Sequence, residues 1–206
     1  MLVPIHPDNP DPRKIRQVVD CLNNGGVIVY PTDTVYSYGC ALGNNEGMDR
    51  IARLKGIKPK QAKFSIVCYD LSHLSEYTQP LENQVFRAMR RALPGAFTFL
   101  LRANNNVPKI FKEKKKTIGI RVPDNNIARA IVQELGKPLI ASSVHDEDRI
   151  IEYTTDPELI DERLGGQVEM VVAGGFGGIE PSTIFDCTTG ELEMVRAGKG
   201  DPEAVT

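Results

Sequence analysis

The 206-residue chain has no tryptophan, only four cysteines, and no apolar run approaching the length of a membrane-spanning helix. Such a helix needs about 20 consecutive apolar residues, so we expect no membrane segment. The first residues, MLVPIHPDNPDPRK, lack both the basic region and the apolar core of a secretory signal peptide. A cytoplasmic location is therefore the expectation.

The few cysteines are widely scattered, at Cys21, Cys40, Cys68 and Cys187. They form no C-x-x-C pair, and no histidine stands at metal-ligand spacing from them. In a cytosolic domain of this size, buried thiols are favoured over disulfides. We expect no metal ion bound by protein side chains.

Three familiar catalytic motifs are also missing. The chain contains no G-x-x-x-x-G-K-[ST], its GGFGG does not complete G-x-G-x-x-G, and it has no G-x-S-x-G. These absences argue against a P-loop kinase, a Rossmann dehydrogenase and an α/β-hydrolase. No tightly bound cofactor is expected.

What is present indicates one α/β domain covering residues 1–206. Hydrophobic residues make up 41% and charged residues 25%, as is usual for a soluble globular protein. Asp11 and Pro12 begin a helical pattern that Gly25-Gly26 ends. Further helices are predicted over 45–54, 82–93 and 126–135, and an acidic helical segment is predicted between 143 and 168. In the 82–93 helix, Val85, Phe86, Met89 and Leu93 are expected to face inward, and Arg87, Arg90 and Arg91 largely outward.

Strands are predicted over 27–30, 64–69, 97–103, 117–123 and 138–143, and over 168–174. The last two, 182–187 and 192–198, flank a Thr189-Gly190 turn and read as a hairpin. Because βα units and a hairpin occur together, a twisted sheet of parallel and antiparallel strands with flanking helices is favoured over a purely parallel one.

Charge is unevenly distributed along the chain. From Arg53 to Arg121 there are 15 Lys or Arg and 4 Asp or Glu, so this part carries +11 and the rest carries −13. The two blocks could be solvated faces that balance each other. They could equally form a positive face that attracts polyanions, and the charge count leaves both interpretations open.

Polar side chains gather where the predicted strands and helices end. They are Thr32, Thr34, Lys55, Lys58, Thr117, Arg121, Ser142, Ser143, Ser182 and Thr183. Ligands of α/β sheets lie outside strand ends, and lysine, arginine and hydroxyl groups bind oxyanions. Taken singly, each residue could be a helix cap or a solvated side chain. Together they indicate a phosphate or nucleotide site.

Five fragments, in order, resemble the YrdC/YciO family from about Gly25 to Gly198. PTDTVYSYG is similar to its PT-(D/E)-TVYGLG signature, RLKGIKPKQAKFSIVC falls at its Lys-x-Arg segment, and PGAFTFLL resembles PG-x-(Y/F)-T. KTIGIRVPDNNIARAIV is close to a further family pattern, and STIFDCTTGELEMVRAG resembles STI-(V/I)-D…RxG. The resemblance implies a twisted α/β domain with a large, positively charged concave face.

The resemblance also implies partners and chemistry. Members are associated with double-stranded RNA or tRNA, and the enzymes among them are L-threonylcarbamoyladenylate synthases. These join threonine, bicarbonate and ATP, and release pyrophosphate, in the pathway to threonylcarbamoyladenosine in tRNA. ATP enters as its complex with a divalent metal such as Mg²⁺. The oligomeric state does not follow from the resemblance.

By position, the resemblance assigns threonine binding to Thr34, Arg121 and Ser182. It assigns nucleotide binding to Lys55, Lys58, Thr117, Ser143 and Arg196. Thr32, Tyr36, Cys68 and His145 are candidates for the cleft wall, with Tyr36 equally able to be a core residue. No side-chain nucleophile is needed, because the chemistry is positioning and charge neutralisation.

Four positions depart from the family pattern. Ser37 replaces a glycine, Ile57 stands at the Arg of Lys-x-Arg, Cys68 replaces a common His, and His145 replaces an Asn. Three hypotheses follow: an RNA-associated nucleotidyltransferase of the synthase type, an RNA-binding module of the YciO-like branch that has lost synthesis, or a soluble α/β protein that binds an unrelated anion.

Overall fold

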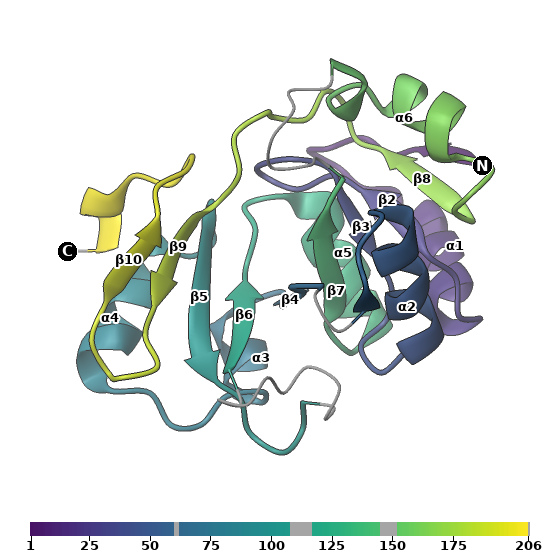
Figure 1. Cartoon of the computed structure of the whole chain (residues 1–206). Helices are drawn as coiled ribbons and strands as arrows, with labels where there is room; N and C mark the ends of the chain where they lie inside the picture. Colours follow the sequence, from purple (N-terminus) through teal and green to yellow (C-terminus); the bar gives the residue numbers. More distant parts are fainter. Residues whose placement is uncertain (60–61, 108–116, 145–151, 206) are drawn as a thin grey trace.

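The computed structural model describes residues 1–59, 62–107, 117–144 and 152–205. Within these residues the strands form one ten-stranded sheet in the order β1-β8-β2-β3-β7-β4-β6-β5-β9-β10. Because β1 and β10 form its two edges, the N- and C-termini lie at opposite sides of the molecule (Figure 1). The strands are β1 (Leu2–Pro4), β2 (Ile28–Tyr30), β3 (Ser37–Gly39), β4 (Ser65–Val67), β5 (Phe97–Arg102), β6 (Thr117–Arg121), β7 (Leu139–Ser143), β8 (Met170–Ala173), β9 (Thr183–Asp186) and β10 (Glu193–Arg196).

The sheet is mixed, as the sequence predicts. β8 pairs in parallel with β1 and β2, β6 with β4, and β9 with β5. The remaining pairs, β2·β3, β3·β7, β4·β7, β5·β6 and β9·β10, are antiparallel. This confirms the single α/β domain and the predicted C-terminal hairpin.

The α-helices are α1 (Pro12–Asn23), α2 (Asn45–Leu54), α3 (Leu71–Ser75), α4 (Asn83–Ala92), α5 (Asn126–Leu135) and α6 (Pro157–Leu164). Two short 3-10 turns, η3 (Glu152–Thr154) and η4 (Pro202–Val205), complete the described elements. None of the described helices is long and apolar enough to cross a bilayer.

The predicted helix ends are confirmed where local chemistry sets them. The Asp11 carboxylate accepts a hydrogen bond from the Arg13 backbone N–H and caps α1. Gly136 ends α5 in the left-handed conformation, with a φ of 70°.

The prediction of which α4 residues face inward is partly wrong. Val85 and Met89 are buried as expected, but Phe86 is 43% exposed, and Ala88 and Ala92 take the inner positions. The buried residues follow the i, i+3, i+4, i+7 spacing of one helix face, and Phe86, one position after Val85, lies about 100° around the helix from it.

β1, β3, α3 and η4 have no predicted counterpart. β3 reads Ser-Tyr-Gly, which lacks the alternation of a half-buried strand, yet it pairs with β2 on one side and β7 on the other. Pairing with β2 and β7, rather than the hydrophobic pattern of its own residues, makes this segment a strand.

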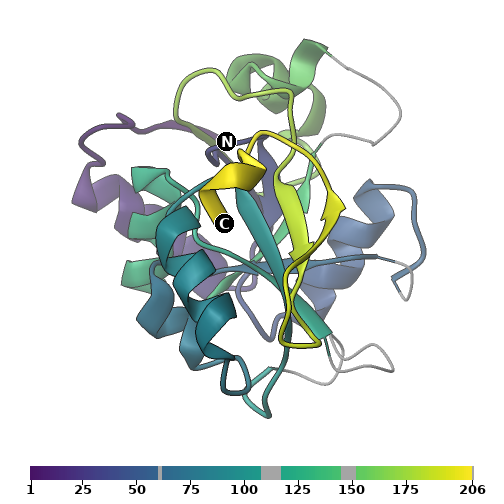
Figure 2. The same ribbon diagram turned by 90° about the vertical axis from the view of Figure 1, so that its left-hand side faces the viewer.

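Hydrophobic side chains form a core on each face of the sheet. Successive residues of β4 alternate between them, with Ile66 in one core cluster and Val67 in the other. The cluster that holds Val67 contains the buried faces of α1 and α5, which lie side by side. Figures 1 and 2 both show α2 on the opposite side of the strands.

The cysteines are free thiols. Cys40, Cys68 and Cys187 are buried as predicted, whereas Cys21 is only partly buried. Burial raises the pKa of Cys40 and of Cys187 to about 12, so both remain protonated at neutral pH.

Candidate functional site

The segment between β2 and β3, residues 31–36, is folded around its own hydroxyl groups. The Thr32 hydroxyl donates to the Val35 carbonyl at 2.7 Å and accepts from the Thr34 N–H at 3.1 Å. The Thr32 and Thr34 hydroxyl oxygens lie 3.0 Å apart. Tyr30 pairs with Ser37 and closes the hairpin beneath the segment. The two threonines therefore hold a tight turn and point to a common place.

A buried ion pair joins this turn to the end of β6. Arg121 Nη2 lies 2.7 Å from Asp33 Oδ1 and donates to the Thr34 hydroxyl at 3.0 Å. The two charged side chains are only 7% and 8% exposed. The second carboxylate oxygen, Asp33 Oδ2, accepts from the Asp124 N–H at 3.0 Å. Asp33 thus fixes the guanidinium against Thr34.

Arg121 keeps donor capacity beyond this pair. Its Nε is buried and has no hydrogen-bond partner among the described residues. A guanidinium is planar and always charged, and it presents its donors in a rigid fork that matches a carboxylate. The arrangement can accept an oxyanion while Asp33 holds the side chain in place.

The glycine-rich loop after β8 lies directly against the turn. The Gly178 N–H donates to the Thr34 carbonyl at 2.7 Å. The Tyr36 hydroxyl donates to the Gly175 carbonyl at 2.7 Å and accepts from the Gly174 N–H at 3.1 Å. A Cβ on Gly178 would stand 2.5 Å from the Thr34 carbonyl oxygen, so only glycine permits this approach.

Tyr36, which the sequence leaves open as wall or core, is fully buried. Burial raises the pKa of its hydroxyl to about 12, so it remains a neutral donor at ordinary pH. Its position makes it a tie between the turn and the glycine loop.

The last part of the chain completes this side of the site. The Ser182 hydroxyl lies 2.7 Å from that of Thr98, and the Ser182 carbonyl accepts from Arg196 Nη2 at 2.9 Å. The Lys199 N–H donates to the Pro181 carbonyl at 2.8 Å, and the Lys199 ammonium donates to the Asp33 carbonyl. Thr34, Arg121, Ser182 and Arg196 are therefore linked through one network.

Lys55 and Ser143 form a second group. Lys55 follows α2, and its ammonium donates to the Ser143 carbonyl at 2.9 Å. Ser143 ends β7 and stands opposite Ser37 of β3, which is buried. Ser37, at the family's glycine position, is therefore a direct neighbour of a predicted nucleotide residue. Lys58 is exposed and makes no hydrogen bond or ion pair within the described part of the chain.

Other predicted residues are not brought to these groups. Thr117 begins β6 and Arg121 ends it, so at about 3.3 Å per residue they lie about 13 Å apart along the strand. Cys68 is fully buried among core side chains rather than on a cleft wall, because β4 turns it into the core, and burial raises its pKa. His145 lies outside the described residues.

Sequence reasoning missed Asp33 and Lys199. Asp33 lies between two threonines that the sequence selects, so its place within PTDT was the available signal. Lys199 follows the RxG-like ending and carries no local signal.

The basic segment is only partly visible. Lys60, Lys109, Lys112 and residues 114–116 fall outside the described residues, and Arg87, Arg90 and Arg91 lie on the exposed side of α4. The positively charged concave face therefore stays a prediction. Within the described residues, no group of three or more His, Cys, Asp or Glu could hold a metal ion.

Comparison with known proteins gives several relatives. Over 199 residues the chain is 43% identical to the "Uncharacterized protein YciO" of Escherichia coli (strain K12), covering 96% of this chain and 95% of that protein. It is 30% identical over 183 residues to a protein of Coxiella burnetii (strain RSA 493) named threonylcarbamoyl-AMP synthase, covering 87% of this chain and 96% of the relative.

Solved structures agree with the fold. The crystal structure of E. coli YciO matches with a TM-score of 0.91 and 40% identity, covering 100% of this chain and 99% of that one. The P. abyssi Sua5 structure complexed with L-threonine matches with a TM-score of 0.85 and 22% identity. That match covers 96% of this chain and 57% of Sua5. Because the identity is only 22%, the match supports the fold and no more.

The sequence model of the Sua5/YciO/YrdC family, described as "Telomere recombination", matches residues 20–198. This range includes the turn at residues 31–36, Lys55, Arg121, Ser143, Ser182 and Arg196. The chain belongs to the Sua5/YciO/YrdC family.

Proposed function

We propose that this protein binds a nucleotide and RNA and makes L-threonylcarbamoyladenylate from threonine, bicarbonate and ATP, for tRNA modification. One observation carries the proposal: the buried Arg121 donates to the Thr34 hydroxyl, which adjoins that of Thr32, and Lys199 ties the same turn to the backbone next to Ser182. The 30% identical relative named threonylcarbamoyl-AMP synthase supports it.

In this proposal Arg121 binds the threonine carboxylate. Its Nη2 is fixed by Asp33 and Thr34, so the guanidinium needs no reorganisation when the substrate arrives. Thr34 and Ser182 contact the remainder of the amino acid, and Thr32 and Tyr36 hold the turn and the loop that carry them.

The nucleotide half contains Lys55, Ser143 and Arg196, with Lys58 and Thr117 further out. Lys55 already reaches the Ser143 carbonyl, so its ammonium is held near the end of β7. ATP enters with Mg²⁺ as a substrate complex, and the lysines offset the phosphate charge. Ser65 pairs with Gly119 of β6 and with Ala141 of β7, so Thr117 lies at the same end of the sheet as Ser143, which supports a place on the nucleotide side.

The reaction needs no protein nucleophile. The threonine amine adds to bicarbonate with loss of water, and a carbamate oxygen then attacks the α-phosphorus of ATP. The bond to the β,γ-phosphates breaks, and pyrophosphate leaves with the electron pair. The side chains orient the reactants and offset charge, which is the work that phosphoryl and nucleotidyl transfer require.

A binding module without synthesis is the second candidate. It is favoured by Ile57, which is 37% exposed at the position of the family's arginine and offers no charge there. Ser37, buried at the family's glycine position beside Ser143, favours it too.

Calorimetry with ATP and with threonine, followed by a pyrophosphate-release assay containing bicarbonate, separates the two candidates. The synthase predicts binding of both substrates and pyrophosphate release that depends on threonine. No ATP binding and no pyrophosphate would refute the synthase and leave RNA binding open.

RNA binding needs its own test. If the basic segment contacts phosphates, the affinity for tRNA falls steeply as salt rises, because bound counterions are released. An affinity that is unchanged between low and physiological salt would refute this contact.

A further inference from the structure

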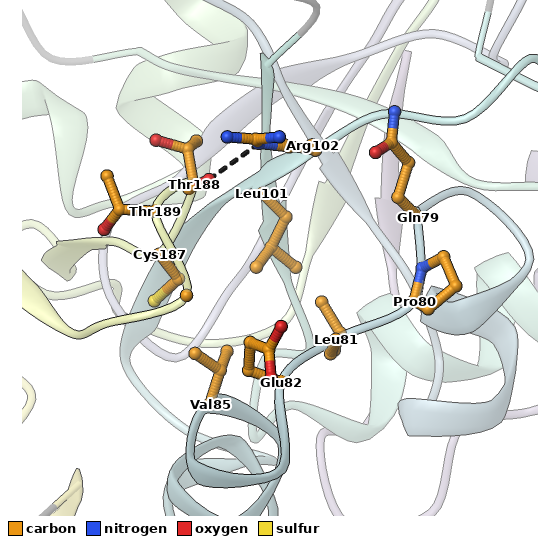
Figure 3. Close-up of a pocket in the computed structure, with 11 residues that line it drawn as sticks. Gln79, Pro80, Leu81, Glu82, Val85, Leu101, Arg102, Cys187, Thr188 and Thr189 are labelled. Atoms are coloured by element: carbon orange, nitrogen blue, oxygen red, sulfur yellow. Dashed lines mark hydrogen bonds between the residues drawn. The ribbon is translucent and has the colours of Figure 1, made fainter.

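A small pocket of about 170 Å³ lies at the ends of β5 and β9 remote from Ser182 (Figure 3). β5 and β9 run in parallel, and Ser182 and Thr98 lie near their beginnings. Cys187, just beyond β9, is about 16 Å along the chain from Ser182 at 3.3 Å per residue. The pocket is lined by Gln79, Pro80, Leu81, Glu82, Val85, Leu101, Arg102, Cys187, Thr188, Thr189 and Gly190.

Hydrogen bonds tie the walls of this pocket together. The Gln79 N–H donates to the Arg102 carbonyl at 2.8 Å, and Arg102 Nε donates to the Thr188 carbonyl at 2.7 Å. On the other side, the Gln84 amide donates to the Gly190 carbonyl at 2.6 Å. Three segments that are distant in sequence are thus fixed against one another, so the pocket is formed before any ligand arrives.

The turn that forms one wall requires glycine. Gly190 has a φ of 93°, and a Cβ there would stand 2.9 Å from Glu82 Cγ. The left-handed φ favours glycine at this position, and the turn lies against the Glu82 side chain.

Opposite charges face the pocket from its two ends. In Figure 3, Arg102 lies at one end and Glu82 at the other, with the apolar side chains of Leu101 and Leu81 between them. Arg102 uses only Nε in its bond to Thr188, and Glu82 makes no side-chain cap for α4. Neither side chain forms an ion pair within the described part of the chain.

We propose that this pocket is a second ligand site that binds an α-amino acid in its zwitterionic form. The ligand carboxylate pairs with the terminal nitrogens of Arg102, and its ammonium pairs with the Glu82 carboxylate. The Thr188 hydroxyl is not counted among the ligand's partners, because it donates to the Asp186 carboxylate at 2.7 Å.

The volume of the pocket limits the size of the ligand that it can hold. Its volume is several times the roughly 30 Å³ that one water occupies in the liquid, which suits a molecule of six to ten non-hydrogen atoms. It is smaller than the roughly 300 Å³ of the smallest drug-sized sites. A free amino acid fits these limits, whereas a nucleotide does not.

L-Threonine is the probe for the first test, with sites counted by equilibrium dialysis. The inference predicts two sites in the wild-type protein and one in Arg102→Gln or Glu82→Gln, each of which weakens the pocket at least about tenfold. Arg102→Lys keeps the charge and retains part of the affinity. Arg87→Gln, an exposed arginine on α4, is the control and leaves both sites in place.

Two analogues test the ends of the pocket separately. N-acetyl-L-threonine lacks the ammonium and should bind the pocket no better in wild type than in Glu82→Gln. L-Threoninamide lacks the carboxylate and should not distinguish wild type from Arg102→Gln.

The pocket itself does not depend on the proposed function, whereas the count of two wild-type sites includes the threonine site at Arg121, and the outcomes separate the two. A single wild-type site that Arg121→Lys weakens and Arg102→Gln leaves intact would overturn the second site. A single site with the reverse behaviour would support the pocket and refute threonine binding at Arg121. No threonine binding at all would overturn both.

Discussion

The two halves of the candidate site differ in how deeply they are buried. Around Arg121, an ion pair, two hydroxyls and a glycine loop are bonded to one another and almost excluded from water. Around Lys55, the ammonium donates to the Ser143 carbonyl from a partly exposed side chain, and Lys58 is exposed.

This contrast indicates that the two halves have different tasks, with selection of one substrate in the Arg121 half and phosphate binding in the lysine half. A buried, fixed arginine loses little freedom when it binds a small substrate, so its half suits recognition of one molecule. A lysine ammonium is a compact point charge, and Lys55 is partly exposed, so its half suits the phosphate groups of a nucleotide. The predictions below challenge this contrast, beginning with the largest effect.

Arg121→Ala should destabilise the protein by about 3–5 kcal/mol, because it leaves the Asp33 carboxylate buried without its cation. Urea unfolding measures the loss. The matched control is Arg50→Ala, since the Arg50–Glu169 pair is 34% and 42% exposed and should contribute about 1 kcal/mol or less. Equal losses of unfolding free energy in the two variants would contradict the claim that the Arg121 half is more deeply buried than the lysine half.

Arg121→Lys tests the role of the guanidinium shape, because it keeps the positive charge at this position. A lysine cannot reproduce the planar fork, so threonine binding should fall more than RNA binding. Equal losses in calorimetry with threonine and in RNA titration would count against the proposed role of Arg121.

Lys55→Ala should weaken ATP binding by about ten- to a hundredfold, the range for one hydrogen bond to a charged group. Lys58→Ala should cost less, because its side chain is exposed and not held in place. Calorimetry with ATP compares them. A loss for Lys58 as large as that for Lys55 would instead show that Lys58 supplies the charge missing at Ile57.

Gly178→Ala should cost about 1–3 kcal/mol, because its Cβ would overlap the Thr34 carbonyl and push the loop from the turn. Gly166→Ala is the control, since its Cβ would have no atom within 4 Å. Thermal unfolding and threonine affinity should both change for the first variant and for neither in the second. An unchanged Gly178→Ala protein would show that the loop is not fixed to the turn.

Stability should fall as the pH rises above 9. Burial raises the pKa of Cys40 and of Cys187 from 9.0 to about 12, so the unfolded chain loses these protons first. The unfolded state then binds fewer protons, and the free energy of unfolding decreases by about 1 kcal/mol per thiol between pH 9 and pH 10. Urea unfolding at pH 8, 9 and 10 tests this, and Cys187→Ala should reduce the slope. A flat or rising profile would contradict it.

Much of the fold is predictable because its signals are local. Asp11 caps α1 and Gly136 ends α5 where the sequence predicts, since a cap depends on a few neighbouring residues. The prediction for Phe86 is wrong because a helical pattern indicates which face of the helix is buried. It does not indicate which residues at the edge of that face contact a neighbouring element.

The candidate site is less predictable because its contacts are distant. Thr34 and Arg121 were selected through the family resemblance, and they do touch across 87 positions. Asp33 and Lys199 were not selected, since nothing near Lys199 indicates a carbonyl 166 positions away. Thr117 and Arg121 lie four residues apart in the predicted strand over 117–123, and the structure keeps that separation because both belong to β6.

The sheet order also constrains when the protein can become functional. β2 carries the turn that holds Thr34, yet its neighbour β8 begins at Met170, and the Asp33 carbonyl receives its ammonium from Lys199. A ribosome-bound chain shorter than about 170 residues has no β8 to cover that side of β2. Pairings across so many residues form slowly, because loop closure precedes any gain from contact. The site is therefore complete only once residues 170–199 have been synthesised, and a product that ends before them lacks part of it.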